Sequence, residues 1–219
     1  MKNKFKKNKL CGIYLISPPK IEKNTFKVNL KIALQTKKIS CFQLRMKDYK
    51  DSEIIETGKF LKKICDSYNT NFILNDRADL AYKIGADGVH IGQQDSEYEY
   101  SRKILGESSI IGVTCHNSKK LALKAYKKGA NYIAFGSFFK TETKIPKTKA
   151  TTNLIRWSNK NINIPCVAIG GINTKNCGKV IESGADYIAL ISGIWNYYRG
   201  IEESINEIYN EINTIKSCK

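Results

Sequence analysis

Residues 71–77 read NFILNDR, and residues 87–95 read DGVHIGQQD. Each stretch starts with a short apolar run and then reaches a carboxylate, Asp76 in the first and Asp95 in the second. One amphipathic helix fits between them, so the pattern predicts a strand, a helix and a second strand with an acid at the same end of both strands. Either acid alone can cap a helix or begin a turn. As a pair they predict a magnesium site, because Mg²⁺ often takes one or two carboxylates together with substrate phosphates.

The rest of the chain repeats this alternation of apolar runs and helical patterns. Strands are predicted at 12–17, 41–46, 71–75, 87–91, 109–114, 131–136, 164–169 and 186–191. The clearest helix covers 51–68, and isoleucines spaced four and three apart in 201–215 predict a last helix with a core-facing stripe. The tripeptides at 85–87, 129–131 and 184–186 read GAD, GAN and GAD, and each Gly can end a helix in the left-handed conformation.

Eight such units in about 200 residues predict an α/β fold, a single-domain (β/α)8 TIM barrel. A doubly wound open sheet is the alternative fold, but no G-x-G-x-x-G follows the first predicted strand, which disfavours its dinucleotide-binding form. We expect one barrel domain over 11–219. The lysine- and asparagine-rich residues 1–10 resemble the start of a signal peptide, but the apolar run that follows is too short, so they predict a solvated, flexible leader.

The composition excludes several classes of protein. The 219 residues are 42% apolar, enough for a sizeable core, and no apolar run reaches the roughly 18 residues of a membrane span. The seven cysteines form no C-x-x-C, which favours a reducing cytoplasm over a disulfide framework or a zinc site. The formal net charge of +17 invites a nucleic-acid reading, but 32 of the basic residues are Lys and only 5 are Arg. We expect anionic small-molecule substrates instead, with a homo-oligomeric state left open.

In a TIM barrel the chemistry lies at the carboxyl ends of the strands, so those ends predict the site. After the second strand, alternation puts Gln43, Arg45 and Lys47 on one face, where they favour an anionic ligand. After the fifth strand stand Thr114 and His116, for which proton transfer and helix capping are both open. His90, alone among apolar neighbours, is expected to be a hydrogen-bonded core group.

Two further segments extend this prediction around the mouth of the barrel. The loop over 137–150 is the longest, and its TETK at 141–144 is expected to close over an anionic substrate. Glycines at 170–171 and the SG at 192–193 predict a phosphate site after the seventh and eighth strands. Two anion sites in one mouth suit transfer between two phosphorylated substrates.

The motifs now stand in order: QLR-x-K at 43–47, NDR-x-DLA at 75–81, GADGVHIGQ-x-D at 85–95, T-x-TK at 141–144, AIGGI at 168–172 and IS at 191–192. Together they resemble the thiamine-phosphate synthase family over essentially the whole barrel, and the second and third motifs are the most specific. The resemblance implies a transferase of thiamine biosynthesis. Such an enzyme joins hydroxymethylpyrimidine pyrophosphate to a thiazole phosphate, giving thiamine monophosphate and pyrophosphate.

The resemblance also implies residue roles. Mg²⁺ on the pyrophosphate would be held by Asp76 and Asp95. The residues that would neutralise the departing charge are Gln43, Arg45, Lys47, Asn75 and Lys144. The residues that would seat the thiazole phosphate are Thr141, Thr143, Gly171, Ile191 and Ser192. Thr114 would touch the pyrimidine, and the residues expected to be catalytic are Arg45, Lys47, Lys144 and Thr114.

This chain departs from the family pattern at Met46, where Glu is usual, at Pro18-Pro19, and at residues 138–140. Two alternative functions remain. The thiazole tautomerases of the same superfamily would rely on His116 but would not need both Asp76 and Asp95. A non-catalytic nucleic-acid-binding protein would show steep salt dependence and leaves the carboxylate pair unexplained.

Overall fold

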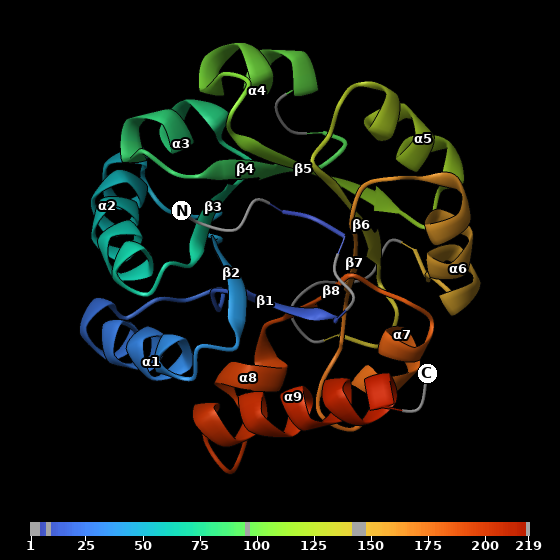
Figure 1. Cartoon of the computed structure of the whole chain (residues 1–219). Coiled ribbons are helices and arrows are strands. Elements are labelled where there is room, and N and C mark those ends of the chain that lie inside the picture. The colour runs from blue at the N-terminus through green and yellow to red at the C-terminus, as the bar shows by residue number, and fades with distance from the viewer. Residues whose placement is uncertain (1–4, 8–9, 95–96, 142–147, 218–219) are drawn as a thin grey trace.

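Eight parallel strands form a closed barrel in chain order, with helices around its outside (Figure 1). The computed structural model describes residues 5–7, 10–94, 97–141 and 148–217. The strands are β1 Gly12–Ile16, β2 Ile39–Leu44, β3 Asn71–Asn75, β4 Gly88–Ile91, β5 Ile110–His116, β6 Tyr132–Gly136, β7 Cys166–Ile169 and β8 Tyr187–Leu190. The helices are α1 Lys23–Gln35, α2 Asp51–Ser67, α3 Ala78–Ile84, α4 Tyr98–Leu105, α5 Lys119–Lys127, α6 Thr152–Asn161, α7 Cys177–Glu182, α8 Ser192–Trp195 and α9 Ile201–Ser217.

This architecture confirms the predicted (β/α)8 barrel. Every strand begins and ends within two residues of the position expected from the sequence. The isoleucine stripe of α9 faces the core, since Ile205, Ile208 and Ile212 are buried there. Gly85 and Gly184 begin two of the repeated tripeptides and have φ values of 73° and 91°. This is the left-handed conformation that ends a helix.

The third residue of each repeated tripeptide closes the amino-terminal end of the barrel. Asp87 accepts a hydrogen bond through Oδ2 from the backbone N–H of Phe72 at 2.7 Å, while its own N–H donates to the Phe72 carbonyl at 2.9 Å. Asn131 makes the same side-chain contact with the N–H of Ile111, and Asp186 with that of Cys166, each at 2.8 Å. The repeat therefore gives a side-chain partner to the backbone N–H groups of Phe72, Ile111 and Cys166, each the first or second residue of its strand.

The barrel interior is filled at its amino-terminal end by aromatic rings. Tyr14, Tyr132 and Tyr187 point inward and are buried. Space for these rings depends on two glycines: a Cβ on Gly112 would lie 1.9 Å from Cζ of Tyr132, and one on Gly12 would lie 2.5 Å from Cδ1 of Tyr187. The second, larger core lies between the strands and the surrounding helices.

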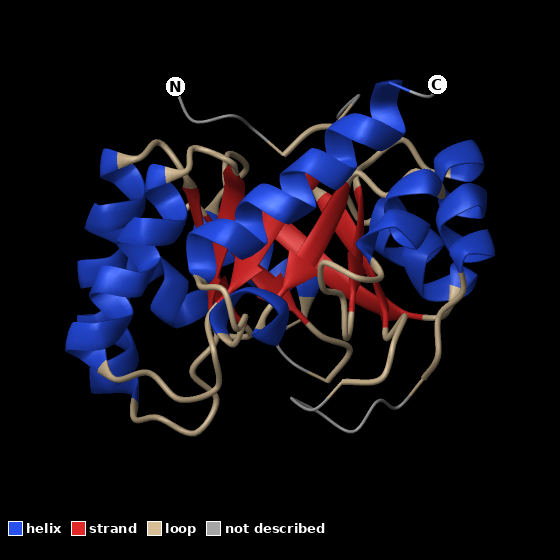
Figure 2. Cartoon of the chain, turned by 90° about the horizontal axis from the view of Figure 1, so that it is seen from below, coloured by secondary structure: helices blue, strands red, loops and turns tan. Residues whose placement is uncertain are grey.

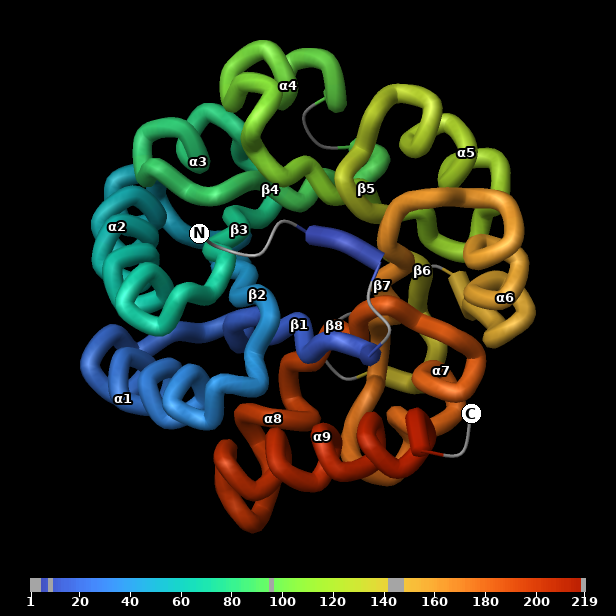
Figure 3. The backbone as a smooth tube through the Cα atoms, in the orientation of Figure 1, coloured from blue at the N-terminus to red at the C-terminus, as the bar shows by residue number. Residues whose placement is uncertain are grey.

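Residues 5–7 lie across this aromatic end of the barrel (Figure 3). The Phe5 ring stacks on Tyr132 with centroids 4.5 Å apart and packs against Tyr187 at 4.5 Å and Tyr14 at 5.8 Å. The prediction of a solvated leader is therefore wrong for Phe5, which is buried because its ring completes the barrel core. Seen from the side, this segment lies at one end of the barrel and the loops that follow the strands lie at the other (Figure 2).

Along the described ranges, no helix is long and apolar enough to cross a membrane. The cysteines at 11, 41, 65, 115, 166 and 177 are all outside disulfide bonds. Five of these six are buried, as expected of small core residues.

Candidate active site

A cavity of about 460 Å³ opens at the carboxyl ends of the strands, and all eight strands or the loops that follow them contribute to its lining. Its charged lining residues, within the part of the chain that the structure describes, are Arg45, Lys47 and Asp76. The opposite side of the cavity consists of small and apolar residues such as Gly171, Ile191 and Ala189. The cavity therefore has one charged side and one side built from backbone and apolar groups.

Ten residues that the sequence predicted for the site line this one cavity. They are Gln43, Arg45, Lys47, Asn75, Asp76, Thr114, Thr141, Gly171, Ile191 and Ser192. Asp95, Thr143 and Lys144 lie outside the described residues, so their places stay predictions. His116, the residue on which the tautomerase alternative relies, also lines the cavity.

On the charged side, Asp76 and Lys47 form an ion pair with 2.8 Å between Oδ2 and Nζ. The Asp76 backbone has a φ of 67°, and its N–H donates to the His90 carbonyl at 2.8 Å. This left-handed turn ends β3 and puts the carboxylate at the mouth of the barrel. The side chain of Asp76 is 20% exposed and that of Lys47 is 39% exposed, so both charges remain within reach of a ligand.

The neighbouring Arg45 is anchored through its backbone. Its N–H donates to Oγ of Ser17 at 2.9 Å, and Ser17 is buried at the end of β1. Ser17 was not predicted to take part in the site, because the following Pro18-Pro19 suggested an uninformative strand end. The contact fixes the point from which the Arg45 side chain enters the cavity.

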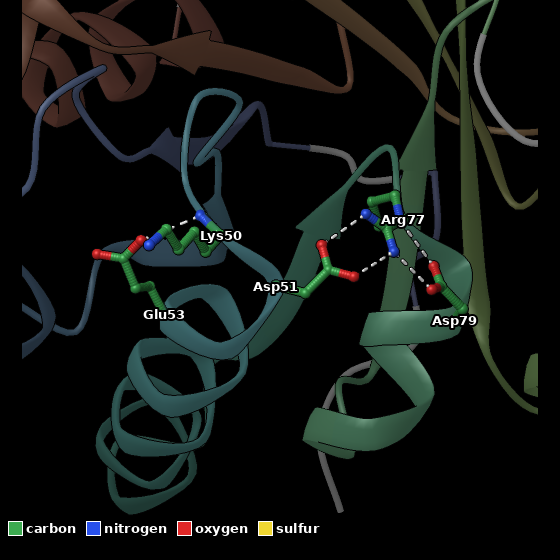
Figure 4. Close-up of polar contacts among 5 residues, drawn as sticks. All are labelled: Lys50, Asp51, Glu53, Arg77 and Asp79. Atoms are coloured by element: carbon green, nitrogen blue, oxygen red, sulfur yellow. Dashed lines mark hydrogen bonds and ion pairs between the residues drawn. The ribbon is translucent and has the colours of Figure 1, made fainter.

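Arg77 stands beside Asp76 in the sequence but serves a different purpose (Figure 4). Its guanidinium donates to both carboxylate oxygens of Asp51 at 2.8 Å, and to those of Asp79 at 2.9 and 2.7 Å. These hydrogen bonds from Arg77 hold the pKa of both carboxyl groups below their ordinary values. Arg77 thus ties the first turn of α2 to the first turn of α3. The start of α2 is also fixed by Glu53, which accepts from the Lys50 backbone N–H at 3.0 Å.

A row of hydrogen-bonded side chains forms the floor of the cavity. Gln43 Nε2 donates to the Tyr14 hydroxyl at 3.0 Å, and the hydroxyls of Tyr14 and Tyr132 are 2.8 Å apart. The Tyr132 hydroxyl lies 2.9 Å from Nδ1 of His90, whose Nε2 lies 2.7 Å from Oγ1 of Thr114. Burial raises the pKa of both tyrosines well above the ordinary value, so both stay protonated.

Tyr14 and Tyr132 were not predicted to line the cavity. His90 is hydrogen-bonded, as expected, but it also lines the cavity. The alternation that places Tyr14 with Ile16, and Tyr132 with Ala134, on the inner face was a usable signal for the two tyrosines.

On the opposite side, the backbone approaches the cavity closely because side chains are absent. Gly170 and Gly171 have φ values of 108° and 64°. A Cβ on Gly171 would lie 2.2 Å from the Lys140 carbonyl oxygen, and one on Gly193 would lie 2.6 Å from that of Ile172. Both the conformation and the crowding therefore require glycine at position 171.

The donor atoms at the mouth fit a hard divalent cation. Asp76 offers a carboxylate and Asn75 a side-chain amide, and both line the cavity. No group of three or more His, Cys, Asp or Glu side chains that could hold a metal occurs among the described residues. Magnesium does not need such a group, because it commonly combines one or two carboxylates with water and substrate phosphate oxygens.

Comparison with known proteins places this cavity in context. A family model described as thiamine monophosphate synthase matches residues 13–194. A thiamine-phosphate synthase of Rhodospirillum centenum is 43% identical over 190 residues, covering 87% of this chain and 92% of that protein. One of Pelagibacter ubique is 41% identical over 217 residues, covering 98% of this chain and all of that protein.

Solved structures agree with the sequence comparisons. The thiamine phosphate pyrophosphorylase of Pyrococcus furiosus superposes with a TM-score of 0.82 at 31% identity, covering 95% of this chain and 98% of that one. The orotidine 5'-phosphate decarboxylase of Pyrococcus horikoshii superposes with a TM-score of 0.65 at 15% identity, covering 91% of this chain and 99% of that one. The second likeness shows the shared barrel fold alone.

Proposed function

The chain belongs to the thiamine monophosphate synthase family, and from this membership we propose that it joins hydroxymethylpyrimidine pyrophosphate to a thiazole phosphate. The products are thiamine monophosphate and pyrophosphate, so the enzyme is a transferase. The observation that carries the proposal is the convergence of ten predicted site residues, from separate stretches of the sequence, on one cavity.

The reaction exchanges one bond at the pyrimidine methylene carbon. The bond from this carbon to the pyrophosphate oxygen breaks, and its electron pair leaves with pyrophosphate. The lone pair of the thiazole nitrogen forms the new C–N bond. Because the electron-rich pyrimidine spreads the positive charge of the methylene group, the protein does not need to supply a nucleophile, and its main task is to stabilise the leaving group.

We assign the charged side of the cavity to the leaving pyrophosphate. Asp76, together with Asp95 from the sequence motif, would hold Mg²⁺, which when bound neutralises charge on the phosphate oxygens. Arg45 and Lys47 add two cations beside it, and Lys47 lies 2.8 Å from the Asp76 carboxylate. Gln43 and Asn75 offer neutral hydrogen bonds from the same strand ends. Lys144, by its motif, adds a further cation.

The pyrimidine ring and the thiazole phosphate would occupy the floor and the side of the cavity built from glycines. Thr114, on the floor, is assigned to the pyrimidine ring. The backbone at Gly171 and the start of α8 at Ser192 suit the thiazole phosphate, with Thr141 and Ile191 beside them. Thr143 joins this set by its motif alone. The thiazole nitrogen and the pyrimidine methylene carbon then meet between the charged side and the glycine-built side of the cavity.

The partners of the enzyme are its small phosphorylated substrates. We place the reaction in a reducing cytoplasm, and the thiols of the described cysteines, none of them in a disulfide, support this assignment. Burial raises the pKa of Cys115 to about 12, so its thiol stays protonated and unreactive.

The proposal is tested by incubating the purified protein with both phosphorylated substrates, with and without Mg²⁺, and measuring thiamine monophosphate. We expect product only with the metal, and a loss well beyond tenfold in an Asp76→Asn variant, where tenfold corresponds to about 1.4 kcal/mol. A Glu99→Gln variant is the matched control, because Glu99 is an exposed carboxylate on α4 that pairs with Lys128. A wild type that forms no product but isomerises a thiazole carboxylate phosphate, with activity lost in His116→Asn, would contradict the proposal.

A further inference from the structure

The hydrogen bonds along the cavity floor all run in one direction, from donor to acceptor. The reason is that each side chain has a fixed number of protons to donate. Gln43 Nε2 carries no lone pair, so at 3.0 Å it donates to the Tyr14 hydroxyl. The Tyr14 hydroxyl is fully buried and must find an acceptor for its own proton. The acceptor beside it is the Tyr132 hydroxyl oxygen, 2.8 Å away.

The same reasoning carries the direction onward through the histidine. Tyr132, having accepted from Tyr14, donates its proton to Nδ1 of His90 at 2.9 Å. An Nδ1 that accepts leaves the imidazole proton on Nε2, because a neutral ring has one donor and one acceptor. Nε2 then donates to Oγ1 of Thr114 at 2.7 Å.

The electrostatics of Tyr14 agree with this direction. Its pKa is raised mainly by burial, and the hydrogen bond to Tyr132 raises it further, as a donated proton should. The bond from Gln43 acts in the opposite sense and lowers it, as an accepted proton should.

We propose that Tyr14, Tyr132 and His90 are positioning residues that make Thr114 a hydrogen-bond donor into the cavity, so that the floor favours a ligand atom with a lone pair. A ring nitrogen of a pyrimidine is such an atom, whereas a C–H or N–H at the same place is not. This assignment of the ring nitrogen rests on the proposed function. The direction of the row does not, because it follows from the protein alone.

Packing below the row keeps its geometry from relaxing. The Tyr132 ring fills the space left by Gly112 and lies edge-on against Tyr14. The His90 ring is nearly parallel to that of Tyr132, at 20° and 5.5 Å between centroids. A buried row with few alternative rotamers has little freedom to reverse one bond without reversing all of them.

The direction is tested by ¹⁵N NMR of the imidazole nitrogens in histidine-labelled protein near pH 8. The chain has 2 histidines, so a His116→Asn variant assigns the signals of His90. We expect an unprotonated Nδ1 and a protonated Nε2 in the wild type, and a mixture of tautomers in Tyr132→Phe, which has no proton to donate. A wild type with the proton on Nδ1 would overturn the proposal, because Thr114 would then donate to His90 and offer only lone pairs to the cavity.

The selection of a lone pair is tested with substrate analogues. Two pyrimidine pyrophosphates are compared with the normal substrate, each with one ring nitrogen replaced by C–H. We expect one analogue to lose at least tenfold in kcat/KM with the wild type, and Thr114→Val to lose as much with the normal substrate. In Thr114→Val the kcat/KM for that analogue should be no lower than for the normal substrate. Thr114→Ser keeps the hydroxyl, so its kcat/KM for the normal substrate should stay within about threefold of wild type.

Two results separate the possible failures. If the losses in kcat/KM multiply when Thr114→Val acts on the analogue, Thr114 does not donate to that ring nitrogen. The same holds if the wild type turns over both analogues as well as the normal substrate. A protein that forms no product with any substrate would refute the proposed function, while the NMR result would still decide the direction of the row.

Discussion

The two ends of the barrel are built by opposite means. At the end where the strands begin, Phe5 and Tyr187 close the interior with aromatic rings whose places are set by shape. At the end where the strands finish, Arg45, Lys47 and Asp76 leave charges facing an open cavity. The comparison teaches that a change at the first end should alter stability, and that a change at the second should alter catalysis.

The largest effect is expected at the charged end. Arg45→Ala should lower kcat/KM by roughly 10²–10³, the usual result of removing one group that stabilises developing negative charge. Arg45→Lys should restore part of the loss, because the charge returns without the planar geometry. The free energy of unfolding should change by less than about 1 kcal/mol, measured in urea.

The matched control for this prediction is Arg156→Ala. Arg156 is exposed on α6, and its guanidinium donates hydrogen bonds to Thr152 and Asn153 of the same helix. If this variant lost as much activity as Arg45→Ala, general positive charge rather than the placed guanidinium would account for the effect.

The second effect is expected at the aromatic end. Phe5→Ala removes a ring packed on three tyrosines and should cost about 3 kcal/mol of stability, as buried Phe truncations do. For a chain of this size that corresponds to a Tm lower by roughly 6–12 °C. At 25 °C kcat/KM should stay within about threefold of wild type. Phe60→Ala, on the solvent side of α2, is the control and should leave the Tm almost unchanged. A large activity loss without a Tm change would break the contrast between the two ends.

A smaller effect is expected on the uncharged side of the cavity, where Gly171 brings the backbone close to the ligand. Gly171→Ala should raise the KM for the thiazole phosphate about tenfold, equivalent to about 1.4 kcal/mol, with little change in kcat. The reason is that a Cβ there would press on the Lys140 carbonyl oxygen and shift the backbone. Gly85→Ala introduces a comparable left-handed strain, at φ 73°, with open space around the added Cβ. Equal changes in KM for the two variants would show that backbone strain alone is responsible.

The smallest effect concerns the Arg77 clamp beside the mouth, and it depends on pH. Hydrogen bonds from Arg77 lower the pKa of Asp79 below its ordinary 3.8. A depressed pKa stabilises the fold above the unfolded value, and this contribution disappears as the pH falls through the folded value. Asp79→Asn should therefore cost less than about 1 kcal/mol at pH 7, since the pair is partly exposed, and almost nothing below the lowered pKa. Urea unfolding of both proteins from pH 7 to pH 2.5 measures the difference, and a constant difference would contradict the clamp.

The sequence was sufficient to predict the barrel and much of its mouth. Strand boundaries could be predicted because apolar runs alternate with helices and because Gly85, Gly129 and Gly184 mark the turns. Alternation along β2 correctly brought Gln43, Arg45 and Lys47 to one cavity. These are local signals, repeated in every unit of the chain, and a parallel barrel turns them into positions at one end.

What escaped prediction depends on barrel closure. Tyr14 and Tyr132 are 118 residues apart, and nothing near either one indicates that their hydroxyls meet. Phe5 stands alone in a polar stretch, without the periodicity that predicts burial, and it is buried because the barrel leaves a hole of its size. The pairing of Asp76 with Lys47 is likewise a contact between neighbouring strand ends that neither motif contains.

The central claim is that the charged end of the barrel binds the leaving pyrophosphate through Asp76 and a divalent cation. Isothermal titration calorimetry of the wild-type protein with inorganic pyrophosphate, with and without Mg²⁺, tests it most directly. We predict binding that requires the metal and that is lost in Asp76→Asn but kept in Glu99→Gln. Binding of equal strength without Mg²⁺, or in the Asp76→Asn variant, would contradict the account.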